Sequence, residues 1–411
     1  MMKQLVKNCL KNIPPFKQFL ARMKNLESCI ATQQIRIQQE NLFLKKIIEE
    51  QRKELEMFGK RVDLLEQQLE KQSRKSLDLE KLISSLEQKS RECIVVKNKI
   101  TDYEKQIKRL DSRIDSSNNH MNYLYYKGLH PDCYEVALKD WYYQRTWEYL
   151  DLENPQTFNE KIQWLKLFDN TPLKTRLADK YLVREWVSGK IGNKYLIPLL
   201  GVWDKFDEID FNLLPKQFVL KTNHGSGWNL IVKNKNDMNY IQTKSKFDLW
   251  MKKNFAFFGL ELHYMNIPHK IIAEKYMENM DGDIFDYRFF CFNGRPKYVW
   301  VDIGSGTSDH KRNVYDLQWN LQEYGVSYPQ IVPEPEKPEK FEEMVSLAQK
   351  LCADFAFVRV DFYCVENKIY FGEMTFTPQS GTGKWDDQGQ NYYYGKLIEL
   401  PEKKPIPDRK Y

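Results

Sequence analysis

The stretch that decides the fold is FVRVDFYCVENKIYFGEMTFTP, which runs from Phe357 to Pro378. It contains two runs of β-branched and aromatic residues, Phe357–Cys364 and Ile369–Thr377, which are typical of β-strands. Between the two runs lies Glu366-Asn367-Lys368, a segment that favours a tight turn. The stretch therefore predicts a β-hairpin.

This hairpin predicts two carboxylates on one face. If the chain folds about Asn367, the facing pairs are Arg359–Thr375, Asp361–Glu373 and Tyr363–Phe371, because strand side chains alternate between faces. Facing Cβ atoms lie about 4.5–5.5 Å apart, where like charges repel each other. A Mg²⁺ ion would remove this repulsion, since it usually binds one or two carboxylates together with substrate phosphates.

Two alternatives to a metal site remain open at this point. The face could be solvated, with Arg359 as the counter-ion of both carboxylates. A turn of two residues would also change the register and place Asp361 and Glu373 on opposite faces of the hairpin. The hairpin alone does not decide between a metal site and a solvated face.

Composition limits the class of protein. The chain has 411 residues, of which 42% are hydrophobic and 29% charged, enough for two or more domains with a sizeable core. Its net charge of +6 is spread along the chain and too weak to predict a nucleic-acid partner. Seven scattered cysteines without a C-x-x-C pair favour a reducing compartment and disfavour structural zinc.

No apolar run approaches the length of a transmembrane helix, and the N-terminus lacks the apolar core of a signal peptide. We therefore predict a cytoplasmic protein, with a peripheral position at the inner face of the membrane as the alternative.

The first part of the chain predicts helix without interruption. No proline occurs between Pro15 and Pro131, and Gly59 is the only glycine before position 128. A seven-residue ladder, apolar at eleven of its thirteen positions, consists of Ile30, Ile37, Leu44, Gln51, Phe58, Leu65, Gln72, Leu79, Leu86, Cys93, Ile100, Ile107 and Ile114. Sustained heptads of this kind predict a coiled coil. A lone charged helix could not bury this stripe, so we expect self-association.

These patterns predict three regions. An N-terminal segment covers residues 1–25, and the coiled coil covers 26–117. Its ladder from Ile30 to Ile114, about 85 residues, would reach roughly 130 Å as a helix. Asp115–Asn119 breaks the pattern, and a globular domain follows at 120–411, with a helical lead-in at 120–170. Thr157 and Glu160 form a predicted capping box in this lead-in.

A short strand, Gln217–Lys221, ends on a lysine and leads into the loop Thr222–Trp228. The loop contains Gly225-Ser226-Gly227, whose backbone amides could cradle a phosphate while Lys221 adds charge. This signal is weak, because any β-hairpin can contain such a loop. Lys180, beside the apolar stripe of a helix that opens at Thr171-Pro172, would on its own be an ordinary solvated lysine.

Several segments together resemble the TupA-like proteins of the ATP-grasp superfamily, which occur in bacterial surface-polysaccharide gene clusters. These segments are TFNEKIQWLKLFD, LADKYLVREWV, YLIPLLGVWDKFDEIDF, LPKQFVLKTNHGSG, IIAEKYM and GEMTFTPQSG. The resemblance covers roughly Leu152 to Pro401 and leaves the helical region outside. It implies an α+β ATP-grasp fold, in which two subdomains enclose ATP, preceded here by the coiled coil.

The resemblance also implies roles for individual residues. Those that would bind ATP are Lys180, Lys221, Gly225, Ser226, Gly227, Glu274, Tyr276, Met277 and Asp286. Those that would bind Mg²⁺ are Asp361, Glu373 and Thr375. The last is a departure, because members of the superfamily usually have asparagine at this position. Arg359 would contact the transferred phosphoryl group and, with Lys221, would be catalytic.

The activity implied by the resemblance is ATP-dependent ligation of a carboxylate to an amine through an acyl-phosphate. In a capsule or teichuronopeptide-like polysaccharide, the substrates would be an acidic sugar and an amine, with Lys311 and Arg312 as candidate contacts in the polar loop 305–313. One alternative is a glycosyltransferase, for which Asp302 or Asp281-Gly-Asp283 would have to supply the metal site. The other is a coiled-coil scaffold that binds nucleotide without catalysis.

Overall fold

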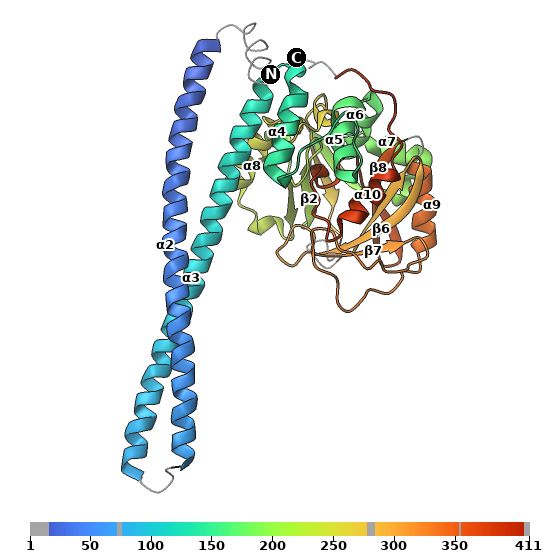
Figure 1. The fold of residues 1–411 in the computed structure, drawn as a ribbon. Helices are drawn as coiled ribbons and strands as arrows, with labels where there is room; N and C mark the ends of the chain where they lie inside the picture. The colour runs from blue at the N-terminus through green and yellow to red at the C-terminus, as the bar shows by residue number, and fades with distance from the viewer. Residues whose placement is uncertain (1–15, 72–75, 278–283, 353–354, 407–411) are drawn as a thin grey trace. The chain divides into compact units, whose positions relative to one another are not determined.

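The computed structural model describes residues 16–71, 76–277, 284–352 and 355–406. By its contacts the chain divides into two compact units, a helical one up to Asn122 and a globular one from Tyr123 onward (Figure 1). Within the described residues, no helix is long and apolar enough to cross a membrane.

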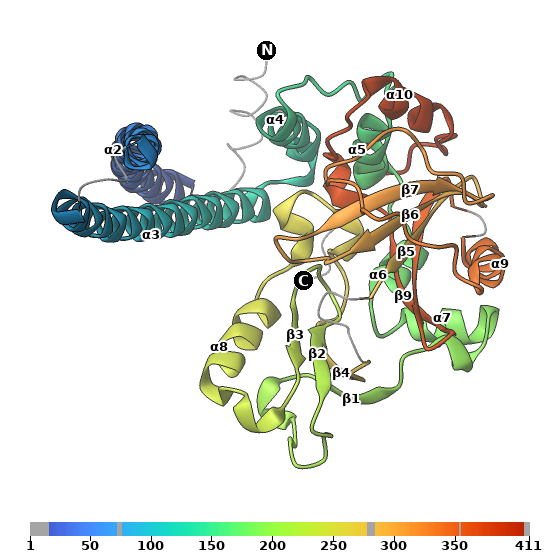
Figure 2. The ribbon, with the colours of Figure 1, turned by 90° about the horizontal axis from the view of Figure 1, so that it is seen from below.

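The helical unit is a hairpin and not one continuous helix. Its two helices, α2 (Phe16–Lys71) and α3 (Ser76–Gly128), run antiparallel side by side (Figures 1 and 2). An ion pair of 2.8 Å joins Arg52 to Glu104, and Ile48 and Ile100 are buried. The two helices therefore bury apolar residues against each other within one chain, and a coiled coil between copies stays a prediction. The ladder position Gln72 lies outside the described residues.

Helix α3 also runs through residues 115–119, where the sequence suggested a break. Serine and asparagine cost at most about 0.7 kcal/mol each in a helix relative to alanine, which neighbouring residues can offset. Because α3 continues past residue 117, it does not test the predicted domain limits, 26–117 and 120–411.

The globular unit contains short helices around two sheets. Its α-helices are α4 (Tyr134–Thr146), α5 (Phe158–Phe168), α6 (Pro172–Ala178), α7 (Val183–Lys190), α8 (Tyr240–Met251), α9 (Phe341–Leu351) and α10 (Gln388–Lys396). Its 3-10 turns are η1 (Pro131–Cys133), η2 (Asn193–Tyr195), η3 (Phe206–Glu208), η4 (Lys235–Asp237), η5 (Phe255–Phe258), η6 (Leu262–Tyr264) and η7 (Pro378–Gly381). The predicted capping box begins α5, where the Thr157 hydroxyl accepts from the Glu160 amide.

The first sheet has four antiparallel strands. In spatial order they are β1 (Leu199–Trp203), β4 (Ile271–Lys275), β2 (Phe218–Thr222) and β3 (Asn229–Val232). Helix α8 lies beside this sheet (Figure 2), and Phe247 of α8 packs into one core with Phe218 and Ile271. This sheet carries Lys221 at the end of β2 and Glu274 on the neighbouring β4.

The second sheet has five antiparallel strands. In spatial order they are β7 (Lys311–Asp316), β6 (Arg295–Ile303), β5 (Asp286–Phe292), β8 (Phe357–Val365) and β9 (Lys368–Thr375). Strand β7 corrects the loop that we predicted up to residue 313, and it forms because its backbone pairs with β6. A single parallel bridge between Leu196 and Phe371 ties the chain before β1 to the second sheet.

The β8–β9 hairpin forms as predicted but with a shorter turn. The turn consists of Glu366 and Asn367, both with positive φ, so Tyr363 pairs with Tyr370 and not with Phe371. A β-bulge opposite Asp361 then restores the predicted pairing of Arg359 with Thr375, and keeps Asp361 and Glu373 on one face.

Gly372 lies in this bulge. A Cβ atom there would lie 3.1 Å from the Tyr363 ring and 3.2 Å from the carbonyl oxygen of Asp361. The close approach explains why glycine suits this position.

Candidate active site

The two carboxylates of the hairpin meet at Arg359. The Nε and Nη2 atoms of Arg359 donate to the two oxygens of Asp361 at 2.7 and 2.5 Å. The same Nη2 donates to Glu373 Oε1 at 3.0 Å, and Thr375 Oγ1 donates to that oxygen at 2.9 Å. The structure thus brings together the four predicted side chains of the hairpin.

The two carboxylates differ in pKa and in access. Burial raises the pKa of Asp361 to about 6, although Arg359 opposes the rise. Burial acts in the same direction on Glu373, but Lys180 and Arg359 outweigh it and lower the pKa to about 2. The side chain of Glu373 is 36% exposed and that of Asp361 only 7%. Glu373 is therefore the more acidic and more accessible carboxylate, and Asp361 is the covered one.

Lys180 joins this hairpin to the glycine loop of the other sheet. It lies in the turn between α6 and α7, and its Nζ donates to the carbonyl oxygen of Gly225 at 2.6 Å. The same Nζ lies 3.7 Å from Glu373 Oε2. One ammonium group thus contacts both the predicted phosphate loop and the predicted metal ligand, although the two are far apart in sequence.

The loop between β2 and β3 is anchored at its base. Thr222, Asn223 and His224 are buried, and the side-chain amide of Asn223 donates to Asp179 Oδ2 at 2.9 Å. Gly225 is also buried, because the ring of Trp228 covers it closely. Only the tip, Ser226 and Gly227, is exposed.

Lys221 pairs with the residue predicted to begin the adenine hinge. Its Nζ donates to Glu274 Oε2 at 2.7 Å, and Arg184 Nη1 donates to the other oxygen at 3.1 Å. Glu274 is buried, so the two cations neutralise it. Tyr276 and Met277 follow directly after β4, as the hinge position requires. The sequence reasoning missed Arg184, although its place four residues after Lys180 was a usable signal.

Arg288 is a second functional candidate that the sequence reasoning missed. Its Nη2 donates to Oδ2 of Asp286, the residue predicted to contact ribose, at 2.8 Å. Its Nη1 lies 2.5 Å from Asp302 Oδ2, and its Nε lies 3.9 Å from Asp361 Oδ2. Arg288 lies two residues after Asp286 on one strand, so strand alternation places both on one face. The arginine links the ribose position to the metal position.

Arg312 is not positioned as a substrate contact. It is buried, and its Nε and Nη2 each donate to Asp302 at 2.6 Å. Burial alone would raise the pKa of Asp302, but Arg288 and Arg312 hold that pKa well below its usual range. This internal ion cluster corrects the role suggested for Arg312, whereas Lys311 next to it is half-buried.

The alternative glycosyltransferase site gains no support from Asp302. That carboxylate is fully buried and occupied by arginines. Asp281 and Asp283 lie outside the described residues.

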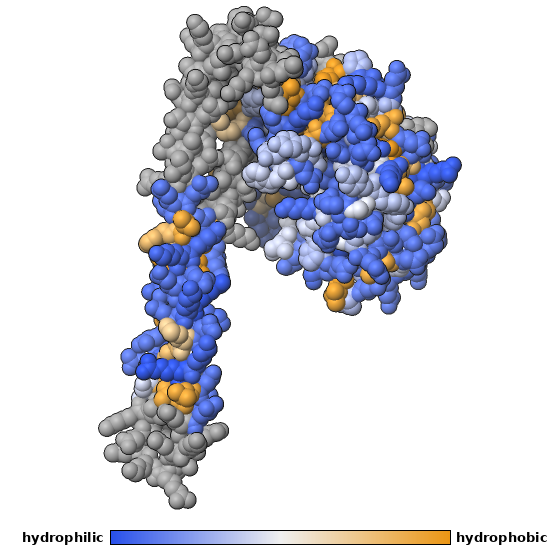
Figure 3. Space-filling view, in the orientation of Figure 1, coloured by the Kyte–Doolittle hydropathy of each residue, from blue (hydrophilic) through white to orange (hydrophobic). Residues whose placement is uncertain are grey.

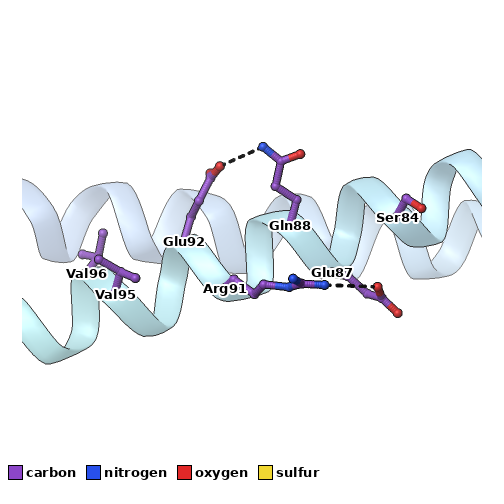
Figure 4. Close-up of a pocket in the computed structure, with 7 residues that line it drawn as sticks. All are labelled: Ser84, Glu87, Gln88, Arg91, Glu92, Val95 and Val96. Carbon is purple, nitrogen blue, oxygen red and sulfur yellow. Dashed lines mark hydrogen bonds and ion pairs between the residues drawn. The ribbon is translucent and has the colours of Figure 1, made fainter.

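A separate hollow of about 710 Å³ lies along α3 in the helical unit (Figure 4). The side chains on it pair locally, as Arg91 with Glu87 at 3.7 Å and Gln88 with Glu92 at 3.3 Å. All the residues that line it come from one helix. It is the surface of an exposed helix, without the convergence of distant segments seen around Lys180.

Comparison with solved structures finds ATP-grasp enzymes of low sequence identity. D-alanine–D-alanine ligase from Bacillus anthracis, complexed with ATP, is 16% identical with a TM-score of 0.34, over 54% of this chain and 65% of that one. The Helicobacter pylori enzyme is 14% identical with a TM-score of 0.34, over 59% and 69%. The ATP-grasp ligase PsnB, complexed with a minimal precursor, Mg and ADP, is 8% identical with a TM-score of 0.30, over 53% and 57%. This chain therefore spans slightly less than two thirds of the first of these enzymes.

No curated protein matches the chain. A family model, described as TupA-like ATPgrasp, matches residues 160–399, which is more than half of the chain. The matched segment contains both sheets and each of the side chains that converge on Arg359 and Lys180. The chain therefore belongs to the TupA-like ATP-grasp family, with an ATP-grasp fold of helices and two antiparallel sheets.

Proposed function

We propose that this protein is an ATP-dependent ligase that joins a carboxylate to an amine through an acyl-phosphate. The observation that carries the proposal is the position of Lys180 Nζ, 2.6 Å from the Gly225 carbonyl oxygen and 3.7 Å from Glu373. It supports a single site in which the phosphate loop of one sheet serves the carboxylates of the other. Membership of the ATP-grasp family supports the reaction class.

The donor groups suit ATP and Mg²⁺. Glu373, Asp361 and Thr375 offer hard oxygen atoms of the kind that Mg²⁺ prefers. Lys180 and Lys221 each present an ammonium group that could pair with phosphate oxygens. Bound Mg²⁺ would neutralise charge on the β- and γ-phosphates.

The residues of the chain would act as follows. Arg359 would turn from Asp361 to the transferred phosphoryl group, which frees the Asp361 oxygens as metal ligands. Lys180 and Lys221 would exchange their present partners for phosphate oxygens. The exposed tip at Ser226 and Gly227 would cover the phosphates and exclude water from the acyl-phosphate.

For the substrates, we propose an acidic sugar as the acid and an amino acid or amino alcohol as the amine. The resemblance to proteins of surface-polysaccharide gene clusters supports this choice. Lys311 remains a candidate contact for the acid, because it is only half-buried at the start of β7. Arg312 would act indirectly, by holding Asp302 in place.

The test is ADP formation from ATP and Mg²⁺ with a panel of uronic acids, free or nucleotide-linked, and amines. We expect ADP only when both an acid and an amine are present. Glu373→Gln should abolish its release, because the accessible metal ligand is lost. Glu366→Gln, in the exposed turn of the same hairpin, is the matched control and should leave the rate unchanged. Undiminished ADP release by Glu373→Gln would contradict the site, and sugar transfer from a nucleotide-sugar without any ADP would contradict the ligase.

A further inference from the structure

The segment Thr377–Gly381, which follows β9, has an unusual backbone. Gln379, Ser380 and Gly381 have φ angles of 49°, 53° and 68°. Two consecutive residues with side chains therefore adopt the left-handed conformation, which L-residues disfavour. Such strain persists only where surrounding contacts hold it, and it clusters at functional sites.

Helix α5 supplies the first of these contacts. The Nζ of Lys166 donates to the Ser380 carbonyl oxygen at 2.6 Å, to Ser380 Oγ at 2.8 Å and to the Gly259 carbonyl oxygen at 3.1 Å. One turn earlier, Gln163 Nε2 donates to the carbonyl oxygens of Ser380 at 2.9 Å and Gly381 at 2.7 Å. The carbonyl groups of the strained turn are therefore held by two side chains of one helix.

A buried carboxylate, Glu261, supplies the second set of contacts that hold the turn. Glu261 accepts a hydrogen bond from the Thr377 hydroxyl, and another at 3.0 Å from Ser380 Oγ. The Ser380 hydroxyl thus accepts from Lys166 and donates to Glu261, which connects the two buried charges.

Glycines make room for this arrangement. A Cβ atom at Gly259 would lie 2.8 Å from Ser380 Oγ, and one at Gly381 would lie 2.5 Å from Gln163 Nε2. A side chain at either position would therefore collide with its neighbour unless that neighbour moved.

Burying the charged groups of this cluster costs folding free energy, which argues that the cluster has a role other than stabilising the fold. Lys166 is fully buried, with its Nζ 4.3 Å from the centre of the Trp141 ring. Burial lowers the pKa of Lys166 to about 7, although the charge of Glu261 opposes the fall. Buried charges of this kind are expensive and stabilise a fold poorly compared with apolar packing.

We propose that Lys166 is a positioning residue, which with Glu261 and Ser380 holds the turn after β9 and thereby the end of the strand that carries Glu373 and Thr375. Thr377 lies two residues after Thr375, so a displaced turn would move the end of β9. The catalytic part of this proposal rests on the proposed function. It gives a shared role to the segments TFNEKIQWLKLFD and TPQSG, whose side chains in this cluster have no role in the proposed chemistry.

The first experiment compares Lys166→Met with Lys161→Met. Lys161 is on the same helix, but its Nζ donates to the Ile398 carbonyl oxygen at 2.8 Å and so anchors a different segment. We expect Lys166→Met to lower kcat by about tenfold or more while KM for ATP stays within about twofold, since small misplacements affect chemistry most. Equal losses in both variants, or a loss that only follows the folded fraction, would overturn the proposal.

The second experiment keeps the buried charges and so avoids the risk that the protein does not fold. Ser380→Ala and Ser380→Gly both remove the hydroxyl, but glycine adopts positive φ without strain. Amide hydrogen exchange over residues 377–382 should quicken in Ser380→Ala by about tenfold, and clearly less in Ser380→Gly. Exchange in both variants as slow as in the unchanged protein would contradict the proposal. This measurement needs no turnover, so it also decides the matter if no acid and amine pair yields ADP.

Discussion

Arg359 is the residue on which the candidate site depends. It binds Asp361 with two hydrogen bonds and Glu373 with a third, so one planar guanidinium contacts both carboxylates. Lysine has the same charge but cannot form this fork. The geometry of Arg359, and not its charge alone, therefore sets the spacing of the two predicted metal ligands.

We predict that Arg359→Lys lowers kcat for ADP formation by about 100-fold, in the range seen when a charge-stabilising donor is lost from an active site. The ammonium group cannot serve both carboxylates and a phosphoryl group at once. Steady-state kinetics with saturating ATP would measure the effect. Arg295→Lys, at the exposed start of β6, is the control, and equal rates for the two variants would contradict the role of Arg359.

His263 makes the fold sensitive to acid. It is buried, and its Nε2 has no hydrogen-bond partner among the described residues. Burial, together with the nearby Lys174 and Lys166, lowers the pKa of His263 well below its usual value. An unfolded histidine titrates near a pKa of about 6.5, so below this pH the unfolded chain binds the extra proton. Stability is therefore expected to fall as the pH drops below that value.

His263→Phe should flatten this dependence by up to about 1.4 kcal/mol for each pH unit below 6.5. Urea unfolding of the globular unit at pH 7.5 and 5.5 would measure the difference. The same replacement at His130, which is exposed, should leave the pH dependence as it is. Identical pH dependence in the two variants would show that His263 is not the sensitive group.

At the scale of elements, the β8–β9 hairpin combines a short turn with a compensating bulge. The turn at Glu366-Asn367 alone would separate the carboxylates, and the bulge at Gly372 reunites them. A side chain at position 372 would press on Tyr363 and on the backbone of Asp361. The bulge thus determines that the two carboxylates share one face of the strand pair.

We predict that Gly372→Ala destabilises the protein by about 1–3 kcal/mol, the usual cost of overpacking, and weakens ATP binding in the presence of Mg²⁺. Gly189→Ala is the control, because nothing lies within 4 Å of a Cβ there and alanine favours helix α7. Thermal unfolding and calorimetric titration with ATP would measure both effects. Unchanged stability and binding in Gly372→Ala would contradict the packing described for the bulge.

Local patterns predicted much of the hairpin and little of the assembly around it. The β-branched and aromatic runs predicted both strands, and the capping box predicted the start of α5 at Thr157. The turn length was wrong, because nothing in Glu366-Asn367-Lys368 distinguishes two residues from three. The reversal after Lys71 was missed, because the same apolar ladder can be buried either within one chain or between chains. The contact of Lys180 with Gly225 depends on tertiary folding, and only the family resemblance pointed to it.

For the whole molecule, the helical hairpin keeps exposed apolar residues. Phe43, Met57 and Leu64 of α2 are each more than half exposed and are separated by multiples of seven residues. Apolar spots stand out among hydrophilic residues along the coloured part of this unit, as they do on the visible face of the globular unit (Figure 3). The prediction of self-association therefore rests on these exposed residues, because the two helices bury other apolar residues against each other within one chain.

We expect sedimentation equilibrium to show a dimer or larger oligomer at micromolar concentration. Replacing Phe43, Met57 and Leu64 together by glutamate should yield a monomer, since helices with heptad-spaced apolar residues associate through them. The control replaces three exposed apolar residues of the globular unit by glutamate, namely Leu213, Ile241 and Leu249. A monomer in the unchanged protein, or dissociation by the control alone, would contradict association through the hairpin.

The anchored base of the glycine loop limits which sequences this family member can tolerate. Thr222, Asn223 and His224 are fixed by burial, Gly225 by the ring of Trp228, and Gly227 by its φ of 72°. Ser226 is the loop residue with a side chain in solvent and an ordinary backbone. We therefore expect Ser226 to tolerate substitution better than the other residues of this loop. If the loop binds nucleotide as proposed, a substitution at Ser226 would change that binding while the buried base of the loop stays intact.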